Sequence, residues 1–310
     1  MKVLCVIPVY NAAGDLHRLL ASLVSQTIGV DILIIDSGSS DGSVDVAKSS
    51  HAHVLEIDNA LFNHGGTRQL AVEMFPNFDV YLYMTQDAYL SDDRAVEMIL
   101  KPFANERVGA VCGRQLPHLN ATPFARHARS FNYPESVLNK TMSDVPKMGL
   151  KTAFMSNSFA AYRRDALNFV GGFPGHVIFA EDMYVAARML INDLIIVYAG
   201  NAQCHHSHNY GFKDEFSRYF DMGVFHVREP WIREVFGGAG GEGARYMKSE
   251  FAFLGLRFWY LWPEALFRNF IKLLGYKLGQ QESYLPSTLK RKLGMYKRYW
   301  DGEFASSSNR

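Results

Sequence analysis

The sequence predicts an α/β fold in which a Rossmann-like, mostly parallel central sheet is flanked by helices and followed by a C-terminal helical extension. The first observation is a run of five apolar residues at 80–84, bounded by polar residues, which is typical of a short strand buried on both faces. The second is that apolar runs alternate with stretches of helical periodicity, because successive βα units favour parallel strands with right-handed crossovers. The third is an aromatic and basic tail after residue 243, which predicts the extension.

The composition describes a globular protein with one main domain. The chain has 310 residues, of which 48% are hydrophobic and 20% are charged, so it can bury a large core. Its net charge of +1 provides no field to hold nucleic acid, which is therefore not an expected partner. The three cysteines, Cys5, Cys112 and Cys204, are too few and too scattered for a disulfide framework or a cysteine-rich zinc site, so we expect a reducing compartment.

No targeting or membrane-spanning segment is expected. The N-terminus leads directly into an apolar strand, without the long apolar region and small-residue cleavage site of a signal peptide. The longest apolar run, at 251–267, is interrupted by charged residues and a proline. These features predict a cytoplasmic protein.

The first half of the chain predicts βα units in order. The first strand leads into Pro-Val-Tyr-Asn at 8–11, and the second ends at Asp36 in a loop of serines and glycines whose backbone can approach a ligand closely. Paired glycines open a later helix in the same way, and Arg68 on its first turn can point back toward the strand ends. The elements expected here are strands over 2–7, 30–35, 53–57 and 80–84, and helices over 15–26, after 41, from 62–68 to about 75, and over 93–103.

The second half alternates less regularly. Its expected elements are strands over 108–113, 159–162 and 194–198, and helices that begin near 163 and 180. Residues 114–150 are polar and aromatic without clear periodicity, which in a compact domain indicates a lid or binding loop. The Gly-rich run at 237–243 lacks the Lys-Ser/Thr of a phosphate-binding loop and predicts a linker. We therefore place the domain at 1–236 and the extension at 237–310.

Asp87 stands just beyond the buried strand at 80–84. Ligands of open α/β sheets bind beyond the carboxyl ends of the strands, so a metal or a polar ligand is expected near Asp87. Its alternative role is to cap the next helix. Because Ser91, Asp92 and Asp93 already offer caps there, we expect Asp87 to serve another purpose.

The ordered set of motifs resembles the inverting, nucleotide-sugar-dependent glycosyltransferases of family 2, which have the GT-A fold. The likeness covers about residues 1–230 and rests on the strand order, Pro-Val-Tyr-Asn at 8–11, the Asp36 loop, Asp87 and Glu181-Asp182. Three further motifs look most like bacterial rhamnosyltransferases of O-antigen and related polysaccharide assembly. They are Phe-Asn-His-Gly-Gly-Thr-Arg at 62–68, Thr-Gln-Asp-Ala at 85–88 and His-Ser-His-Asn-Tyr at 206–210.

The resemblance implies a binding site for a nucleotide-sugar donor. Pro8, Tyr10 and Asp36 would line the base pocket, with Asp36 accepting a hydrogen bond from a pyrimidine N–H. Arg68 would approach the base or the diphosphate. A core aromatic role for Tyr10 and a surface helix charge for Arg68 are the alternatives. The donor-binding residues so implied are Pro8, Tyr10, Asp36, Arg68, Gln86 and Asp87.

A divalent cation is expected at the donor phosphates, because the leaving nucleoside diphosphate gains negative charge as the glycosidic bond breaks. Asp87 is the first candidate ligand and His206 the second, and Mg²⁺ or Mn²⁺ suits such a site. Thr85 stands where the family's Asp-X-Asp motif has its first acid, so we expect the ion to arrive with the sugar nucleotide. A zinc cluster of His205, His206 and His208 is the alternative, although their spacing is not that of a helical metal-binding pair.

Inversion requires one base on the face opposite the leaving group. Asp182 matches the family's base position, whereas Glu181 would point roughly 100° away around the helix, so the two acids are not expected to do the same job. Stabilisation of a helix N-terminus by both acids is the alternative. We place Glu181, His64 and His208 in the acceptor or donor pocket.

The implied activity is transfer of a deoxyhexose, L-rhamnose from dTDP-β-L-rhamnose, to a hydroxyl of a lipid-linked or cell-surface glycan, leaving an α linkage. A UDP- or GDP-sugar donor and a non-catalytic glycan-binding protein of the same fold stay open. The first strand lacks the Gly-rich loop of a nucleotidyltransferase or a dehydrogenase. The aromatics and cations of the tail suit a helix on the inner face of an anionic cytoplasmic membrane, and packing on the domain or on a homodimer partner is the alternative.

Overall fold

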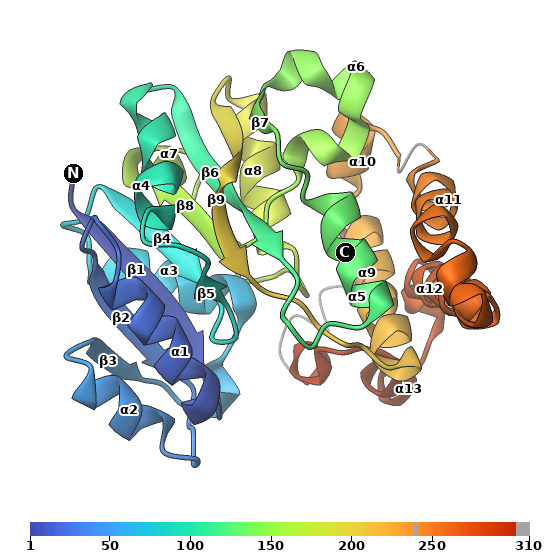
Figure 1. The fold of residues 1–310 in the computed structure, drawn as a ribbon, viewed down its shortest axis with the longest axis horizontal. Coiled ribbons are helices and arrows are strands. Elements are labelled where there is room, and N and C mark those ends of the chain that lie inside the picture. Colours follow the sequence, from blue (N-terminus) through green and yellow to red (C-terminus); the bar gives the residue numbers. More distant parts are fainter. Residues whose placement is uncertain (239–240, 302–310) are drawn as a thin grey trace.

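The computed structural model describes residues 1–238 and 241–301, and within them nine strands form one sheet (Figure 1). The strands lie in the order β3-β2-β1-β4-β8-β6-β9-β5, and β7 pairs with β9. Their bounds are β1 Val3–Val9, β2 Asp31–Asp36, β3 His53–Glu56, β4 Val80–Met84, β5 Tyr89–Leu90, β6 Val108–Leu116, β7 Val137–Lys140, β8 Phe159–Arg163 and β9 Ile195–His205.

Most of the described strands run in one direction. β1 is parallel to β2 and β4, and β2 is parallel to β3. β8 runs antiparallel between β4 and β6, which returns β6 and its parallel neighbour β9 to the direction of β1. Only β5, β7 and β8 oppose the other six described strands. The predicted fold class, a mostly parallel sheet flanked by helices, is therefore confirmed.

Helices cover both faces of the sheet (Figure 1). Buried residues of α1, α2 and α4 form one hydrophobic core with the strands, and those of α3, α7 and α8 form the other. The bounds of these helices are α1 Ala13–Val24, α2 Ser43–Ser49, α3 His64–Met74, α4 Ala95–Leu100, α7 Arg164–Phe169 and α8 Glu181–Ile191.

Strand β4 lies between the two cores. Val80, Leu82 and Met84 contribute to one core, and Tyr81 and Tyr83 contribute to the other. All five side chains are buried, as their unbroken apolar run predicts. The hydroxyl of Tyr83 donates to the carbonyl of Arg68 in α3, and that of Tyr81 donates to the carbonyl of Phe75, just after α3. The polar atoms of both rings are therefore satisfied inside the core.

The segment at 114–150 is largely ordered secondary structure, so the expectation that it is irregular is wrong, while its role as a lid or binding loop stays a prediction. β6 and β9 continue past their predicted ends to Leu116 and His205, and β7 pairs with β9. Helix α5, Pro123–Asn132, begins where Thr122 accepts a hydrogen bond from a backbone N–H of its first turn. Short helix α6 spans Val145–Met148.

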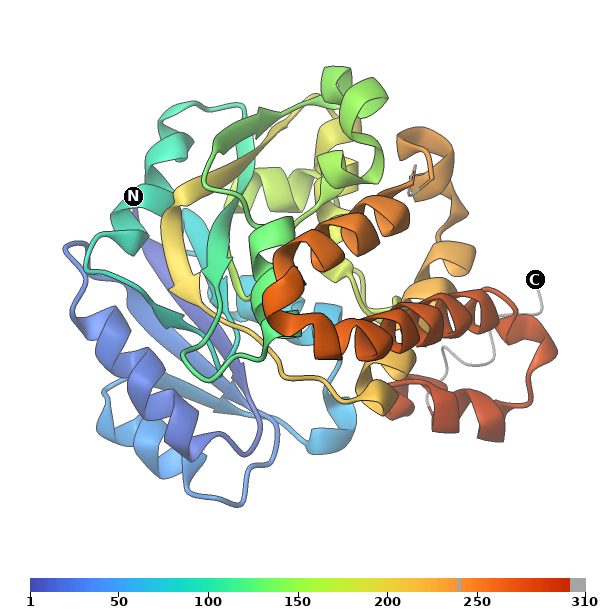
Figure 2. The same cartoon turned by 45° about the vertical axis from the view of Figure 1, so that its right-hand side comes forward.

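The C-terminal extension is helical, as predicted, and packs directly on the domain (Figure 2). Its longest helix, α12, lies along α9 at a crossing made by glycines: a Cβ added to Gly279 would meet the Phe220 carbonyl oxygen at 2.0 Å. No helix among the described residues is long and apolar enough to cross a bilayer. The extension contains α11 Glu242–Leu254, α12 Trp262–Gly279 and α13 Ser287–Leu293, and the domain ends with α9 Phe212–Arg228 and α10 Pro230–Phe236.

The expected linker at 237–243 lies partly outside the described residues, and α11 begins within it at Glu242. The division of the chain at residue 236 stays a prediction.

Candidate active site

The predicted site residues meet beyond the carboxyl ends of the strands, around a cavity of about 1580 Å³. Asp36 does not line the cavity, but its neighbour Ser37 does. Residues 145–151 and 295–299 also line it, so the cavity has walls from both the domain and the extension. The predicted residues that line it are Pro8, Tyr10, His64, Arg68, Gln86, Asp87, Glu181, Asp182, His206 and His208.

The loops that follow β1, β2 and β4 are held together by side-chain amides. Gln86 accepts a hydrogen bond from the backbone N–H of Tyr10 and donates one to its carbonyl, at 2.8 and 3.2 Å. Asn11, at φ 48°, accepts from the N–H of Ser40, and its own N–H donates to Ser39. These bonds fix the Pro-Val-Tyr-Asn loop against its two neighbours.

Asp36 has one free acceptor. Its Oδ2 accepts hydrogen bonds from the N–H groups of Gly38 and Ser39, at 3.0 and 2.9 Å. Its Oδ1 is buried and has no hydrogen-bond partner among the described residues, and the residue as a whole is 1% exposed. A buried carboxylate oxygen without a partner is unfavourable, and because Asp36 does not line the cavity, a ligand N–H would reach this oxygen only if the loop moved.

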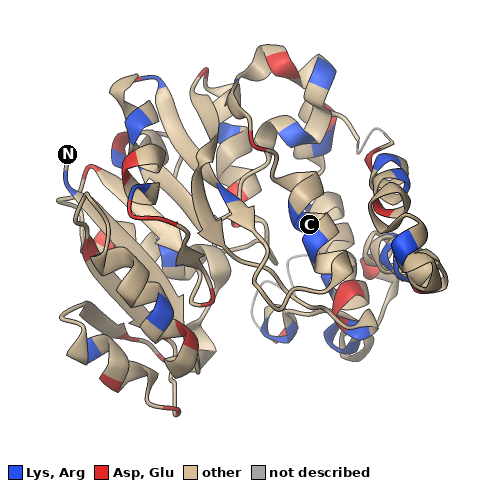
Figure 3. Cartoon of the chain, in the orientation of Figure 1, with Lys and Arg blue, Asp and Glu red and all other residues tan. Residues whose placement is uncertain are grey.

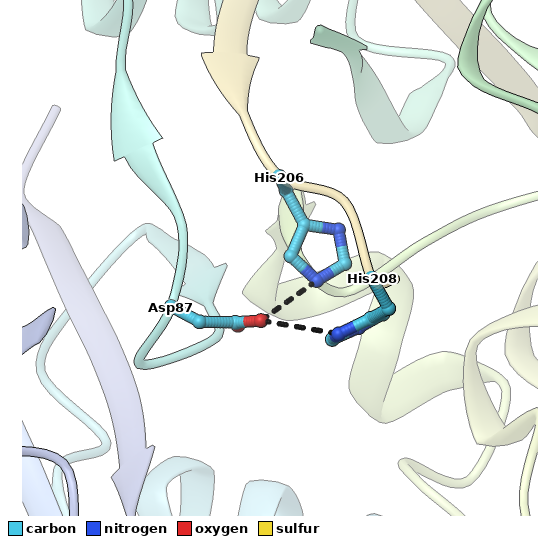
Figure 4. A group of neighbouring side chains, drawn as sticks. All are labelled: Asp87, His206 and His208. Atoms are coloured by element: carbon cyan, nitrogen blue, oxygen red, sulfur yellow. Dashed lines mark ion pairs between the residues drawn. The ribbon is translucent and has the colours of Figure 1, made fainter. Parts of the chain in front are cut away.

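Asp87, His206 and His208 form one cluster at the ends of β4 and β9 (Figure 4). Asp87 Oδ2 lies 3.4 Å from His206 Nε2 and 3.6 Å from His208 Nδ1. One potential ligand atom from each residue lies within 4.8 Å of the other two. Asp87 and His206 were predicted as ligands, whereas His208 was placed only in the pocket.

Gln115 at the end of β6 orients His206. The guanidinium of Arg129 donates to Gln115 Oε1, and Gln115 Nε2 donates to Ser156, so Oε1 is the acceptor end of the amide. His206 Nδ1 lies 2.8 Å from Oε1 and must carry the hydrogen. The neutral ring therefore turns the lone pair of Nε2 toward Asp87. A lone pair and a carboxylate face each other favourably only with a cation between them.

That cation can be a proton or a metal ion, and burial disfavours the proton. Burial lowers the pKa of His206, and it lowers the pKa of His208 to about 3. Burial opposes ionisation of Asp87, but a hydrogen bond from His206 and the charge of the two rings when protonated outweigh this and hold its pKa below the usual range. Two neutral imidazoles and an ionised carboxylate are a donor set that fits a divalent cation.

The three-histidine zinc site is not formed. The ring of His205 stacks on Tyr89 with centroids 4.9 Å apart, and its Nδ1 lies 3.0 Å from the carbonyl oxygen of Pro117. Because side chains alternate along β9, His205 points away from the side that His206 faces.

Glu181 and Asp182 have separate environments, as expected. Glu181 pairs with Arg68 at 3.1 Å and accepts a hydrogen bond from Asn157 at 2.8 Å, and both charged groups are buried. Burial opposes the charge of Glu181, but Arg68, His64 and Asn157 favour it and lower its pKa. The charge of Arg68 is thus committed to Glu181, and not to open space in the cavity.

Asp182 is the acid whose environment suits a base. Burial, followed by the charge of Glu181, raises its pKa to about 7. Its two oxygens accept hydrogen bonds from the N–H groups of Met183 and Asn157, at 2.7 and 3.2 Å, which fixes the carboxylate in the cavity wall. Ala180 precedes the pair at φ 61°, a left-handed conformation that is unfavourable for a residue with a side chain and common at functional sites.

Two supporting residues were missed by the sequence interpretation. Asn157 donates to Glu181 and, through its backbone, to Asp182, while its amide oxygen accepts from Tyr162. Gln115 follows the pattern that identified Asp87, a polar residue at the end of a strand, but the predicted strand ended at 113, before the irregularity in β6 pairing.

Comparison with known proteins agrees with this geometry. Residues 4–171 match the model of the family described as glycosyl transferase family 2. The chain is 47% identical over 312 residues to the O-antigen chain rhamnosyltransferase RfbN of Salmonella typhimurium, covering 99% of each. It is 46% identical over 307 residues to the O-antigen chain rhamnosyltransferase WbaN of Salmonella anatum, covering 98% of this chain and 97% of that one.

Solved structures show the same fold at low identity. The mannosyltransferase PcManGT from Pyrobaculum calidifontis, in complex with GDP-Man and Mn²⁺, aligns with a TM-score of 0.58 at 15% identity, covering 99% of this chain and 86% of that one. TarS of S. aureus aligns with a TM-score of 0.53 at 13% identity, covering 91% of each chain. The chain is an enzyme with the GT-A fold, and it belongs to glycosyl transferase family 2.

Proposed function

We propose that the protein transfers L-rhamnose from dTDP-β-L-rhamnose to a hydroxyl of a lipid-linked O-antigen glycan, with inversion to an α linkage. The observation that carries the proposal is a single cavity that holds both the Asp87, His206 and His208 cluster and the elevated-pKa carboxyl of Asp182. Similarity over nearly the whole chain to two O-antigen chain rhamnosyltransferases supports the choice of sugar and of acceptor class.

The donor nucleotide would bind across the loops that follow β1, β2 and β4. Pro8 and Tyr10 would form the walls of the base pocket, and Gln86 keeps Tyr10 in place through its backbone. A shift of the loop that follows β2 would let the free oxygen of Asp36 accept the ring N–H of thymine, which would satisfy an otherwise unpaired buried atom. These interactions distinguish a pyrimidine with an N–H donor from a base that offers only acceptors there.

Asp87, His206 and His208 would hold a divalent cation. When bound, Mg²⁺ or Mn²⁺ would neutralise charge that develops on the nucleoside diphosphate leaving group. Two imidazole nitrogens beside one carboxylate favour Mn²⁺ over Mg²⁺, which prefers a shell of oxygen ligands.

Asp182 would act as the base. In a single displacement, the acceptor hydroxyl attacks the anomeric carbon as the bond to the phosphate oxygen breaks, and its proton passes to the Asp182 carboxylate. A pKa of about 7 makes this carboxylate a stronger base than an ordinary aspartate while leaving it ionised above neutral pH. Glu181 supplies part of that shift, and its own charge is held by Arg68.

The test is turnover with defined donors. Purified protein, Mn²⁺ and lipid-linked glycan would be incubated separately with dTDP-rhamnose, a UDP-sugar and a GDP-sugar, and product mass and nucleoside diphosphate release would be measured. We expect the acceptor to gain one deoxyhexose only with dTDP-rhamnose. Faster transfer from another donor would overturn the choice of sugar, and no release from any donor would favour a glycan-binding protein without activity.

We further propose that the extension rests on the inner face of the cytoplasmic membrane. Exposed apolar side chains follow one another along α11, the 3-10 segment Leu256–Leu261 and α12. Residues 242–300 contain eleven Lys and Arg against four Glu (Figure 3), and eight of those cations are exposed while all four acids are buried or half-buried. Aromatics with an excess of exposed cations match an anionic lipid surface. The apolar residues are Phe253, Leu256, Trp259, Tyr260, Trp262, Leu266, Phe267, Phe270, Leu273 and Leu274.

Vesicle sedimentation tests this contact. We expect the protein to sediment with vesicles that contain phosphatidylglycerol and to bind weakly to pure phosphatidylcholine. Trp259→Ser with Phe270→Ser should abolish sedimentation, whereas Leu119→Ser, at an exposed apolar residue of the sheet domain, should not. A stable homodimer in light scattering that the double variant dissociates, without vesicle binding, would show instead that a second copy covers this face.

A further inference from the structure

Arg218 on α9 is a cavity-lining cation without a counter-ion. No carboxylate lies within ion-pair distance of its guanidinium, and no hydrogen-bond acceptor contacts it, among the described residues. Other cavity-lining arginines are engaged: Arg68 by Glu181, Arg129 by Gln115, and Arg298 by the carbonyl oxygen of Asn59. Lys147 and Lys297 also lack such partners, but both are exposed to solvent, whereas Arg218 is half-buried.

Aromatic rings surround this guanidinium. Its Cζ lies 5.6 Å from the centre of the Phe179 ring and 6.0 Å from that of Tyr210. Burial raises the pKa of nearby Tyr296 to about 12, so this phenol is neutral at pH 7 and supplies no negative charge. Contacts with ring faces stabilise a cation by only about 0.5–2 kcal/mol each, and they occupy none of the N–H donors of the guanidinium.

The two acids three residues away along the same helix, Glu215 and Asp221, are occupied elsewhere. Glu215 pairs with Arg268 and Lys272 at 3.2 and 3.5 Å. Asp221, three residues later, accepts hydrogen bonds from the N–H groups of Met295 and Tyr296 at 2.9 and 3.0 Å. Burial raises the pKa of Asp221 to about 7, so it is only partly ionised at neutral pH. The charge of Arg218 is therefore left for a ligand.

Arg218 also lies beside the proposed metal ligands. The ring of Tyr210, which Arg218 faces, stacks on His208 with centroids 4.9 Å apart. His208 in turn contacts Asp87 and His206. A group with two phosphates could thus touch the cluster on one side and Arg218 on the other.

We propose that Arg218 binds the diphosphate of the sugar-nucleotide donor and stabilises it as the leaving group. This inference rests on the proposed function and assigns a donor-binding role to a residue that lies outside the sequence motifs. The guanidinium would supply parallel N–H donors to phosphate oxygens, a geometry that lysine cannot reproduce. The single carboxylate of the metal cluster gives this second cation a clear role, because cleavage of the glycosidic bond leaves on the diphosphate a negative charge beyond those that one divalent ion neutralises.

Calorimetric binding of thymidine and dTDP, each with and without Mn²⁺, tests the inference in the full-length protein. Arg218→Gln should weaken dTDP binding about 10- to 100-fold, the loss expected for a charge-assisted hydrogen bond, and change thymidine binding by less than about twofold. Arg218→Lys, which keeps the charge, should bind dTDP with intermediate affinity and covers the case in which the glutamine variant does not fold. Lys213→Gln removes an exposed cation of the same helix and should change neither affinity.

Each contrary result has a separate meaning. If wild-type protein does not bind dTDP, the proposed function fails. If it binds dTDP and both Arg218 variants bind equally well, the function stands and the role of Arg218 is overturned. Equal weakening of thymidine and dTDP together with a lower unfolding temperature would make Arg218 a structural residue. Unchanged dTDP affinity with a raised KM for the lipid-linked acceptor would overturn the role at the donor and assign the charge to acceptor binding.

Discussion

Replacement of Asp182 by asparagine should abolish transfer and also make the protein more stable at alkaline pH. The ordinary pKa of an aspartate is 3.8, and burial together with the Glu181 charge raises the pKa of Asp182 to about 7 in the folded protein. Because the pKa is higher in the folded than in the unfolded state, the folded protein binds the extra proton between these values. The wild-type protein therefore loses stability as pH rises through this window and loses no more above it.

The size of the effect follows from the shift. At about 1.36 kcal/mol per pKa unit, the ionised carboxylate destabilises the fold by about 4 kcal/mol, of which about 2.5 kcal/mol develops between pH 5 and pH 8. Asparagine carries no charge, but its NH₂ group would face one of the two backbone N–H donors, which costs about 1 kcal/mol at every pH. The pH dependence of the difference in unfolding free energy between the two proteins therefore reports the effect of the Asp182 charge alone.

The assay is thermal unfolding of both proteins at pH 5 and pH 8, with EDTA to exclude divalent metal. The unfolding temperature of Asp182→Asn relative to that of the wild type should rise by about 4 °C from pH 5 to pH 8, given the unfolding entropy of a chain of this length. In parallel, wild-type kcat/KM should fall about tenfold per unit below pH 7, while Asp182→Asn still binds dTDP. A pH-independent difference in unfolding temperature, or retained turnover, would refute the reasoning.

The remaining predictions concern the residues around this base. Glu181→Gln should destabilise the fold by about 3–5 kcal/mol in urea unfolding, because Arg68 would stay buried without its partner, and adding Arg68→Met should recover most of the loss. His206→Ala should weaken the Mn²⁺-dependent part of dTDP binding about 10-fold or more in calorimetry and leave metal-free binding unchanged. Gly65→Ala should lower the unfolding temperature by several degrees, since its Cβ would meet the carbonyl oxygen of Pro174 at 1.8 Å.

The strand-end residues were predictable because they depend on local patterns. A buried five-residue run fixes where β4 ends, and Asp87 follows from that alone. The same logic stopped short at β6, where the strand continues past a register shift between Gly113 and Arg114 and ends three residues beyond its predicted end. Gln115 and its effect on the His206 ring were therefore hidden, although the residue type and position were visible.

Arg218 was unpredictable for a different reason. It lies within a helix with alternating charges, a pattern that is typical of a solvent-facing surface. Only the packing of α12 along the other side of α9, made possible by glycines at the crossing, leaves the Arg218 side chain facing the cavity. Its lack of an ion-pair or hydrogen-bond partner also depends on the tertiary structure, because that structure decides which acids and acceptors lie near the guanidinium.

The extension also lines the cavity of the candidate active site, which the division of the chain at residue 236 does not anticipate. Tyr296 packs edge-on against His64 with ring centroids 4.2 Å apart, and Arg298 donates to the carbonyl of Asn59, 239 residues earlier. Asp221 holds the backbone of this returning segment through two N–H groups. The helices that carry the exposed apolar face therefore belong to the same packed unit as a wall of the proposed donor site. A lipid-linked acceptor and a nucleotide-sugar donor would in this way be brought to one cavity by a single continuous segment.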